Sequence, residues 1–171
     1  MSQDASSGAF YIAYPYSGVY MRRVTRSGTT LSLSSPTQVT PNIQRVERQA
    51  LAASVLVSNS VLLGYMIIGW KSVVVASTWN GSSFTTGSQV ILKSPSYYCA
   101  VAADPHNTGT FGALYYPNHY RKITVAGTTI TLEGSQEDIL SSGENFSISY
   151  NPTTANKLFF SARTGSGFEA E

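Results

Sequence analysis

Few residues in this 171-residue chain are of the types that carry out catalysis or bind metals. There are two histidines, His106 and His119, and one cysteine, Cys99. Both histidines fall in predicted loops, without a cysteine or carboxylate cluster nearby at the spacing of metal ligands. We therefore expect the histidines to be exposed polar loop residues and Cys99 to be a small buried residue. The sequence predicts no metal site and no cofactor.

Four acidic residues could in principle supply the paired carboxylates that a glycosidase requires. They are Glu133, Glu137, Asp138 and Glu144. All four lie in one polar connector, where we expect a solvated acidic face. Residues 77–81 are faintly similar to the aspartate-box turn of sialidases but lack its Asp, and no phosphate loop, dinucleotide fingerprint or nucleophile elbow is present. We predict a protein without enzymatic activity, with a sialidase-like or other glycosidase as a distant alternative.

The composition is that of a folded domain with an unusually uncharged surface. Apolar residues make up 42% of the chain, and charged residues only 12%, about half of the usual quarter. The net charge of +2 and the lack of a basic run predict no binding to nucleic acid. No apolar run of about 18 residues predicts membrane insertion, and the polar start of the chain predicts no secretory signal. Up to residue 93 the net charge is +5 and afterwards it is −3, so the two ends have complementary charge.

A duplicated string organises the chain. Residues 127–132, Gly-Thr-Thr-Ile-Thr-Leu, have a near copy at residues 28–33, Gly-Thr-Thr-Leu-Ser-Leu, 99 residues earlier. A degenerate third copy lies about halfway between, at residues 77–84. The repeat unit is therefore about 50 residues long. Glycine followed by alternating apolar and polar residues predicts a tight turn into a β-strand.

The rest of the chain reads as short strands separated by turn residues. The expected strands cover residues 10–14, 19–26, 29–33, 51–57, 61–68, 72–78, 84–92, 97–103, 111–116, 120–125, 128–132, 146–150 and 158–162. They group into one repeat domain, residues 1–171, with units at about 10–40, 49–92, 97–140 and 146–171. Polar links cover 41–48 and 133–144, and the strand pattern of the fourth unit stops near residue 168. The steps Asp104-Pro105 and Asn151-Pro152, 47 residues apart, occupy the same place in their units and predict turns.

Four-stranded antiparallel units of this length are typical of β-propeller blades, each of which buries its faces against its neighbours. The predicted fold class is all-β, with four-stranded antiparallel blades in a β-propeller-like repeat. By this reading the first unit lacks its first strand and the last unit is incomplete. We therefore expect a partner chain or further sequence to cover the end faces, with head-to-tail homo-oligomers as one form of that association.

The repeats resemble the β-propeller-like repeats of bacteriophage tail fibres and related virion proteins. In that family a strand ending in Asx-Pro leads to a second apolar strand and then to a strand that closes on a Gly-Thr-Thr hairpin. The matching residues are 102–109, 111–116, 123–132 and 148–162, and the pattern covers most of residues 10–168. The second unit departs from it, because Asn59 is not followed by proline and residues 80–83 replace the Gly-Thr-Thr turn.

The resemblance implies a non-enzymatic virion component: a tail fibre, knob or surface-decoration protein that contacts other virion proteins and takes part in assembly and host attachment. The alternative is a lectin-like adhesin that binds host-surface glycans. Its candidate binding rim lies at the turns between the second and third strands of the units, where aromatic rings stand beside small polar residues. The rim residues are Tyr14, Tyr16, Trp70, Tyr116, His119 and Tyr120. Wedging of some tyrosines between the blades is the competing interpretation.

Overall fold

The computed structural model describes residues 2–4, 7–40, 49–53, 57, 59–139, 144–164 and 167–170. Within these ranges the chain consists of antiparallel β-sheets, which confirms the all-β class. The predicted link at residues 41–48 lies outside the described residues.

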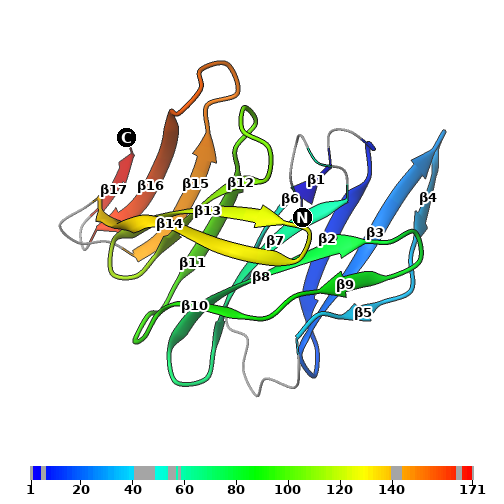
Figure 1. The fold of residues 1–171 in the computed structure, drawn as a ribbon, viewed down its shortest axis with the longest axis horizontal. Coiled ribbons are helices and arrows are strands. Elements are labelled where there is room, and N and C mark those ends of the chain that lie inside the picture. Colours follow the sequence, from blue (N-terminus) through cyan, green and yellow to red (C-terminus); the bar gives the residue numbers. More distant parts are fainter. Residues whose placement is uncertain are drawn as a thin grey trace.

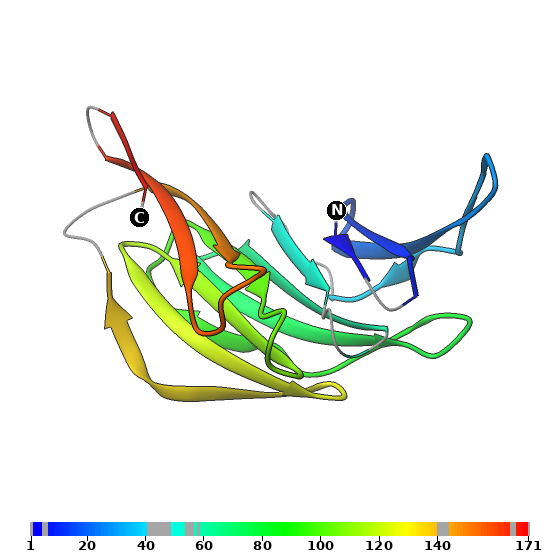
Figure 2. The ribbon, with the colours of Figure 1, turned by 90° about the horizontal axis from the view of Figure 1, so that it is seen from above.

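The strands form four sheets, each of which stacks on the next in chain order (Figures 1 and 2). The first sheet contains β1 (Ser2–Gln3), β2 (Phe10–Pro15), β3 (Val19–Ser27), β4 (Thr30–Leu33) and β5 (Thr37–Gln38). The second contains β6 (Gln49–Ala53), β7 (Ser60–Ile67), β8 (Lys71–Trp79), β9 (Phe84–Thr86) and β10 (Val90–Lys93). The third contains β11 (Cys99–Ala103), β12 (Thr110–Tyr115), β13 (His119–Ala126) and β14 (Thr129–Asp138). The fourth contains β15 (Glu144–Tyr150), β16 (Leu158–Thr164) and β17 (Gly167–Ala170).

Several sequence predictions differ from the structure. The first unit does have a first strand, because β1 pairs with β2 through Ser2↔Tyr11 and Gln3↔Phe10. The strand predicted over residues 84–92 is two short strands, β9 and β10, that both pair with β8. The polar link predicted from residue 133 begins too early, since β14 continues to Asp138. A bulge in β14, between the pairs Lys122↔Glu133 and Tyr120↔Glu137, lets this polar segment keep its pairing with β13.

The duplicated Gly-Thr strings form the hairpin turns that the sequence predicts. Gly28 and Gly127 have φ values of 57° and 61° and start two-residue turns closed by the pairs Ser27↔Thr30 and Ala126↔Thr129. Glycine adopts this left-handed conformation without steric cost, and such turns match the twist of paired strands. The degenerate middle copy is a longer hairpin, closed by Trp79↔Phe84.

A second turn recurs between the first and second strands of the sheets. The amide of Asp104 donates to the carbonyl of Thr110, and that of Asn151 donates to the carbonyl of Lys157, at 2.9 and 2.8 Å. Both side chains accept bonds from amides two residues on, 2.8 Å each, as expected for Asx turns. Asp4 begins a third turn of this kind, because its amide donates to the carbonyl of Ala9 at 2.8 Å. One or two positions before the second strand, a residue has positive φ in all four sheets: Gly8, Asn59, Gly109 and Asn156.

Asp4 is a fully buried carboxylate at the start of the first sheet. It accepts hydrogen bonds from the Asn59 amide at 2.8 Å, from the Tyr11 hydroxyl at 3.2 Å and from the Ser7 amide at 3.2 Å. Because a buried charge is tolerated only with such donors, Asp4 ties the first sheet to the turn that precedes β7. The sequence interpretation, which treated residues 1–4 as a polar lead, missed this role.

Tyrosine-to-phenylalanine substitutions at two buried positions are expected to have opposite effects on stability. Tyr11→Phe removes a donor to a charged group and should cost about 1–3 kcal/mol. The hydroxyl of Tyr65 is buried and has no hydrogen-bond partner among the described residues. Tyr65→Phe should therefore be neutral or stabilise the protein by about 1 kcal/mol. Urea unfolding of the two variants measures both effects, and a loss at Tyr65 similar to that at Tyr11 would contradict this account.

The sheets pack face to face through two apolar clusters. We call the side of a sheet that faces the next sheet in the chain, or the corresponding side of the fourth sheet, the following face. The opposite side is the preceding face. The following face of the first sheet and the preceding face of the second form one cluster: Tyr11, Val19, Met21, Val61, Leu63, Tyr65, Val73 and Val75, with Val39 and Phe84. The second and third sheets form the other: Leu62, Val74, Ala76, Cys99, Val101, Phe111, Ala113, Tyr115, Ile123 and Val125. Alternate residues of β7 and β8 thus serve opposite clusters, and the second sheet is buried on both faces.

Small residues set how closely the sheets approach. A Cβ atom on Gly64 of β7 would lie 2.7 Å from the sulfur of Cys99, and one on Gly112 of β12 would lie 3.1 Å from both Ile148 and Tyr150. The lack of a side chain at Gly64 therefore allows the third sheet to pack closely against the second, and the lack of one at Gly112 allows the fourth to pack closely against the third. Cys99 is buried as predicted, and burial raises the pKa of its thiol to about 12.

Candidate functional site

Three aromatic rings form a continuous group where the second and third sheets meet at their turns. The Trp70 and Tyr97 rings are 4.9 Å apart, and the Tyr97 and Tyr116 rings 4.7 Å apart, both pairs edge to face at 67°. Trp70 ends the turn between β7 and β8, Tyr97 lies in the connection from β10 to β11, and Tyr116 follows β12 (Figure 1). We call these three residues the aromatic cluster. Trp70 is 48% exposed and Tyr97 is 36% exposed, so the cluster is open to solvent.

Two buried serines hold the backbone beneath the aromatic cluster. The Ser96 amide donates to the carbonyl of Trp70 at 2.5 Å, and its hydroxyl donates to the carbonyl of Tyr116 at 3.1 Å. The hydroxyl of Ser72 lies 2.7 Å from both the Ser96 hydroxyl and the Tyr98 carbonyl. Ser72 and Ser96 are fully buried, so these bonds are shielded from water. Trp70 itself has a φ of 56°, which is uncommon for a bulky residue and is maintained by its surroundings.

The structure brings two of the predicted rim residues together and separates the others. Trp70 and Tyr116 meet through Tyr97. The sequence interpretation missed Tyr97 because it assigned this residue to the strand predicted over residues 97–103, whereas β11 begins at Cys99. Tyr14 and Tyr16 form a different group with Tyr20, at ring distances of 6.0 and 6.2 Å from it. Tyr16 is the most exposed of the large hydrophobic side chains described, at 86%.

His119 is not the exposed loop residue that the sequence predicts. It is the first residue of β13, is buried, and pairs with Asp138 of β14. Its Nδ1 atom contacts the Asp138 carboxylate, and its ring lies 5.5 Å from that of Tyr115. The reason for the error is the length of β14, which carries Asp138 alongside His119. Asp138 is thus part of a side-chain pair within the third sheet, while Glu133 accepts a hydrogen bond from Thr124 at 2.8 Å.

Tyr120 lies between the third and fourth sheets. Its hydroxyl is 3.0 Å from that of Tyr150, and its ring fills the space beside Gly112. This position corresponds to the wedge that the sequence analysis considers as the alternative to a rim. Burial raises the pKa of both Tyr120 and Tyr150. The pair is therefore an uncharged contact between sheets.

Alkaline pH is expected to unfold this protein. Burial, followed by the negative charge of Asp4, raises the pKa of Tyr11 from 10.0 to about 12, and burial also raises the pKa of Tyr65 and Tyr115. Below about pH 10 these groups are protonated in both states, so they give no pH dependence. Between about pH 10 and 12 the unfolded chain releases protons that the folded chain retains, so stability falls as the pH rises. Melting temperature and phenolate absorbance measured against pH should change together, whereas titration of all eleven tyrosines in a folded protein would contradict this.

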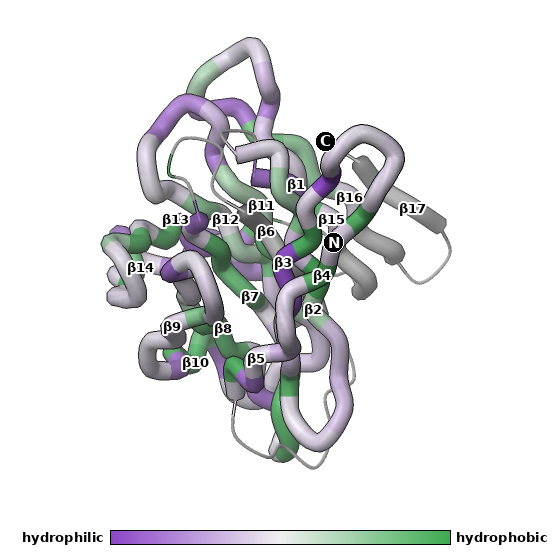
Figure 3. The backbone as a smooth tube through the Cα atoms, turned by 90° about the vertical axis from the view of Figure 1, so that its right-hand side faces the viewer, coloured by the Kyte–Doolittle hydropathy of each residue, from purple (hydrophilic) through white to green (hydrophobic). Residues whose placement is uncertain are grey.

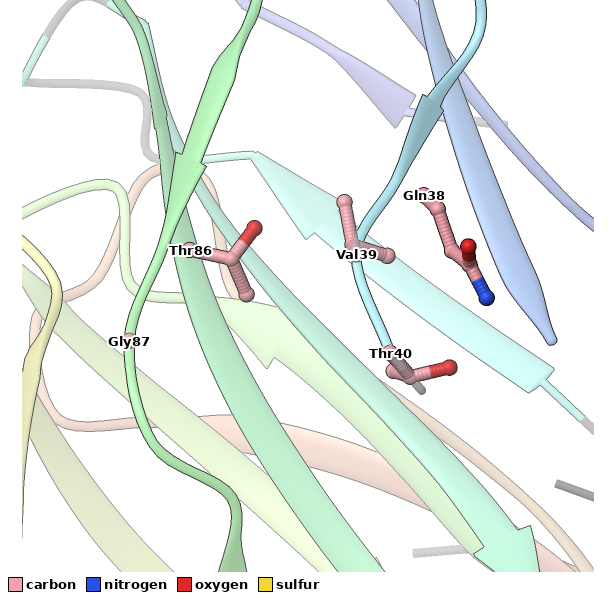
Figure 4. A pocket seen from close by; sticks show the side chains of 5 residues that line it. All are labelled: Gln38, Val39, Thr40, Thr86 and Gly87. Atoms are coloured by element: carbon pink, nitrogen blue, oxygen red, sulfur yellow. The ribbon is translucent and has the colours of Figure 1, made fainter. Parts of the chain in front are cut away.

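A shallow pocket lies between the first and second sheets, away from the aromatic cluster. It has a volume of about 320 Å³ and lies between the segment after β5 and the end of β9 (Figure 4). Its lining residues are Gln38, Val39, Thr40, Thr86 and Gly87. These side chains contain no titratable group, so the pocket has no side-chain acid or base for proton transfer.

Two sheet faces are not packed against another sheet in the described part of the chain. The preceding face of the first sheet, at the end of the molecule seen in Figure 3, exposes Leu31 at 61% and Leu33 at 53%. The following face of the fourth sheet exposes Phe159 at 52%. Both faces are candidates for contact with another chain.

Other kinds of site were searched for among the described residues. No group of three or more His, Cys, Asp or Glu side chains is placed to hold a metal ion there. The same residues contain no helix long and apolar enough to cross a membrane. Comparison of the chain with models of protein families, with curated proteins and with solved structures found no match.

Proposed function

We propose that this chain is a non-enzymatic structural protein of a bacteriophage virion, a tail-fibre, knob or surface-decoration component built from β-propeller-type blades. The observation that carries the proposal is the repeated packing of the four sheets. Each sheet stacks on the next in chain order, and the first strands β6, β11 and β15 lie next to one another. Propeller blades are arranged in this way.

A rigid stack of sheets suits a mechanical role in a particle. Buried clusters join the first sheet to the second and the second to the third, so these sheets hold their turns in fixed relative positions. The repeated Asx turns and Gly-Thr hairpins, which resemble those of phage tail-fibre repeats, also support the proposal. In this role the protein contacts other virion chains and contributes to assembly and host attachment at the particle surface.

The location of the protein in virions tests this proposal. Particles produced from the genome that encodes the chain would be purified and analysed by mass spectrometry and by immunogold electron microscopy. The expected result is a stoichiometric component, labelled on the tail or the particle surface. Detection only in the soluble fraction of infected cells, with none in purified particles, would refute the proposal.

A lectin-like role in glycan binding is the second candidate, and the aromatic cluster is the observation that favours it. Exposed aromatic rings on a hydrogen-bonded backbone give contact area at low entropic cost. On a glycan array, Trp70→Ala and Tyr97→Ala should lose binding that the unmodified protein shows. Tyr16→Ala is the matched control, because Tyr16 is exposed but lies outside the cluster. Binding that survives both cluster substitutions, or no glycan binding by the unmodified protein, would exclude this role for the cluster.

A further inference from the structure

The uncovered face of the first sheet repeats a face that is buried elsewhere in the same protein. In the first sheet Phe10, Val24 and Leu33 are paired across β2, β3 and β4. In the third sheet Phe111, Ile123 and Leu132 are paired in the same way across β12, β13 and β14. Directly paired residues lie on the same side of a sheet. Each set therefore forms one row across the preceding face of its sheet.

The match extends along both faces. The pair Ile12↔Arg22 corresponds to Ala113↔Arg121, and Arg26↔Leu31 corresponds to Val125↔Ile130. The apolar third-sheet residues of these rows are buried in the cluster shared with the second sheet or pack against it. Leu31 and Leu33, in contrast, are more than half exposed. The first sheet thus has the side chains of an inter-sheet contact without the sheet that would cover them.

A single face in the described part of the chain is available to complete that contact. The following faces of the first three sheets are already covered by the sheet that comes next. The following face of the fourth sheet presents Ser147, Ser149, Phe159 and Ser161, which are paired as Ser149↔Phe159 and Ser147↔Ser161. The corresponding residues of the third sheet are Ala100, Ala102, Gly112 and Leu114. Both faces have small residues on the first strand, so both allow close approach of a neighbouring sheet.

We propose that a second copy of this chain docks its fourth sheet, through Phe159 and the small residues of β15, onto the preceding face of the first sheet. The contact continues the stacking seen between the sheets of one chain. It is heterologous, and copies joined in this way either close into a ring or extend as a filament. The opposite net charges of the two halves of the chain, +5 and −3, favour this orientation over contact between two first sheets. The inference rests on the assembly role proposed above.

A mixing experiment with two interface variants tests the proposal. Leu31→Glu/Leu33→Glu blocks the face of the first sheet, and Phe159→Glu blocks that of the fourth. Sedimentation should show that the unmodified 171-residue chain associates and that each variant alone is monomeric. An equimolar mixture of the two variants should form 1:1 dimers, because one intact pair of faces remains. Ile91→Glu adds one negative charge, as Phe159→Glu does, at an exposed apolar position of β10 and should leave association unchanged.

The mixture distinguishes the proposed contact from the alternatives. Monomers in the mixture, despite association of the unmodified chain, would mean a contact between identical faces or at another surface, and would overturn the proposal. Association of the Phe159→Glu variant alone, or an unmodified chain that stays monomeric, would overturn it as well. If a glutamate variant fails to fold, Leu33→Ser and Phe159→Ser replace the pair. These results are independent of whether the protein is found in virions, so the two proposals can fail separately.

Discussion

Phe111→Ala is expected to lower the free energy of unfolding by about 3–5 kcal/mol, whereas Phe10→Ala, at the corresponding position of the first sheet, should cost only about 1–2 kcal/mol. Phe111 is fully buried between the second and third sheets. Phe10 is half-buried on a face that no other sheet of the described chain covers. Replacing phenylalanine by alanine at these corresponding positions therefore removes more buried apolar surface at Phe111 than at Phe10.

Urea unfolding at low protein concentration would measure this difference. Both substitutions would be made in the Leu31→Glu/Leu33→Glu background, so that association contributes to neither value. Equal losses at the two positions would show that the face of the first sheet is covered within the chain. In the unmodified background, Phe10→Ala should then weaken association, while Phe111→Ala should act on folding.

Local patterns in the sequence were sufficient to predict most strands and the hairpins. At Gly28 and Gly127 the turn requires a left-handed residue, and alternating residues follow at once, so the signal lies within a few positions. The Asx turns at Asp104 and Asn151 are equally local. The sequence pattern could not predict which neighbouring sheet each residue of β7 and β8 contacts. Leu62 and Leu63, for example, are both apolar but lie on opposite faces, and only the packing shows which sheet each contacts.

The errors concern residues whose roles depend on distant partners. Asp4 looks like part of a polar terminus, but the amide of Asn59, 55 positions away, donates a hydrogen bond of 2.8 Å to its carboxylate. A two-residue strand such as β1 has no periodicity to detect. His119 is buried because Asp138 lies across from it. Tyr97 joins Trp70 and Tyr116 only because three separate connections converge, which no single stretch of sequence indicates.

Gly109→Ala is expected to be far more damaging than Gly8→Ala, although the two glycines occupy the same place in equivalent turns. Their φ values are 66° and 65°, so alanine suffers the same backbone strain at both positions, about 1–2 kcal/mol. At Gly8 nothing lies within 4 Å of the added Cβ atom, whereas at Gly109 the carbonyl oxygen of Val125 would be 2.6 Å away. That oxygen belongs to backbone and cannot rotate aside, so Gly109→Ala should cost a further 1–3 kcal/mol or so.

Substitution of each glycine by asparagine distinguishes the cost of backbone strain from the cost of steric overlap. Asn59 and Asn156 hold the equivalent positions of the second and fourth turns with φ values of 65° and 60°, which shows that this side chain is compatible with the turn. Gly8→Asn should therefore be nearly neutral, because asparagine tolerates the left-handed conformation. Gly109→Asn should remain destabilised by roughly the steric part, about 1–3 kcal/mol. Urea unfolding of the four variants gives both differences, and equal stability of Gly8→Asn and Gly109→Asn would show that β13 shifts freely to admit a side chain at Gly109.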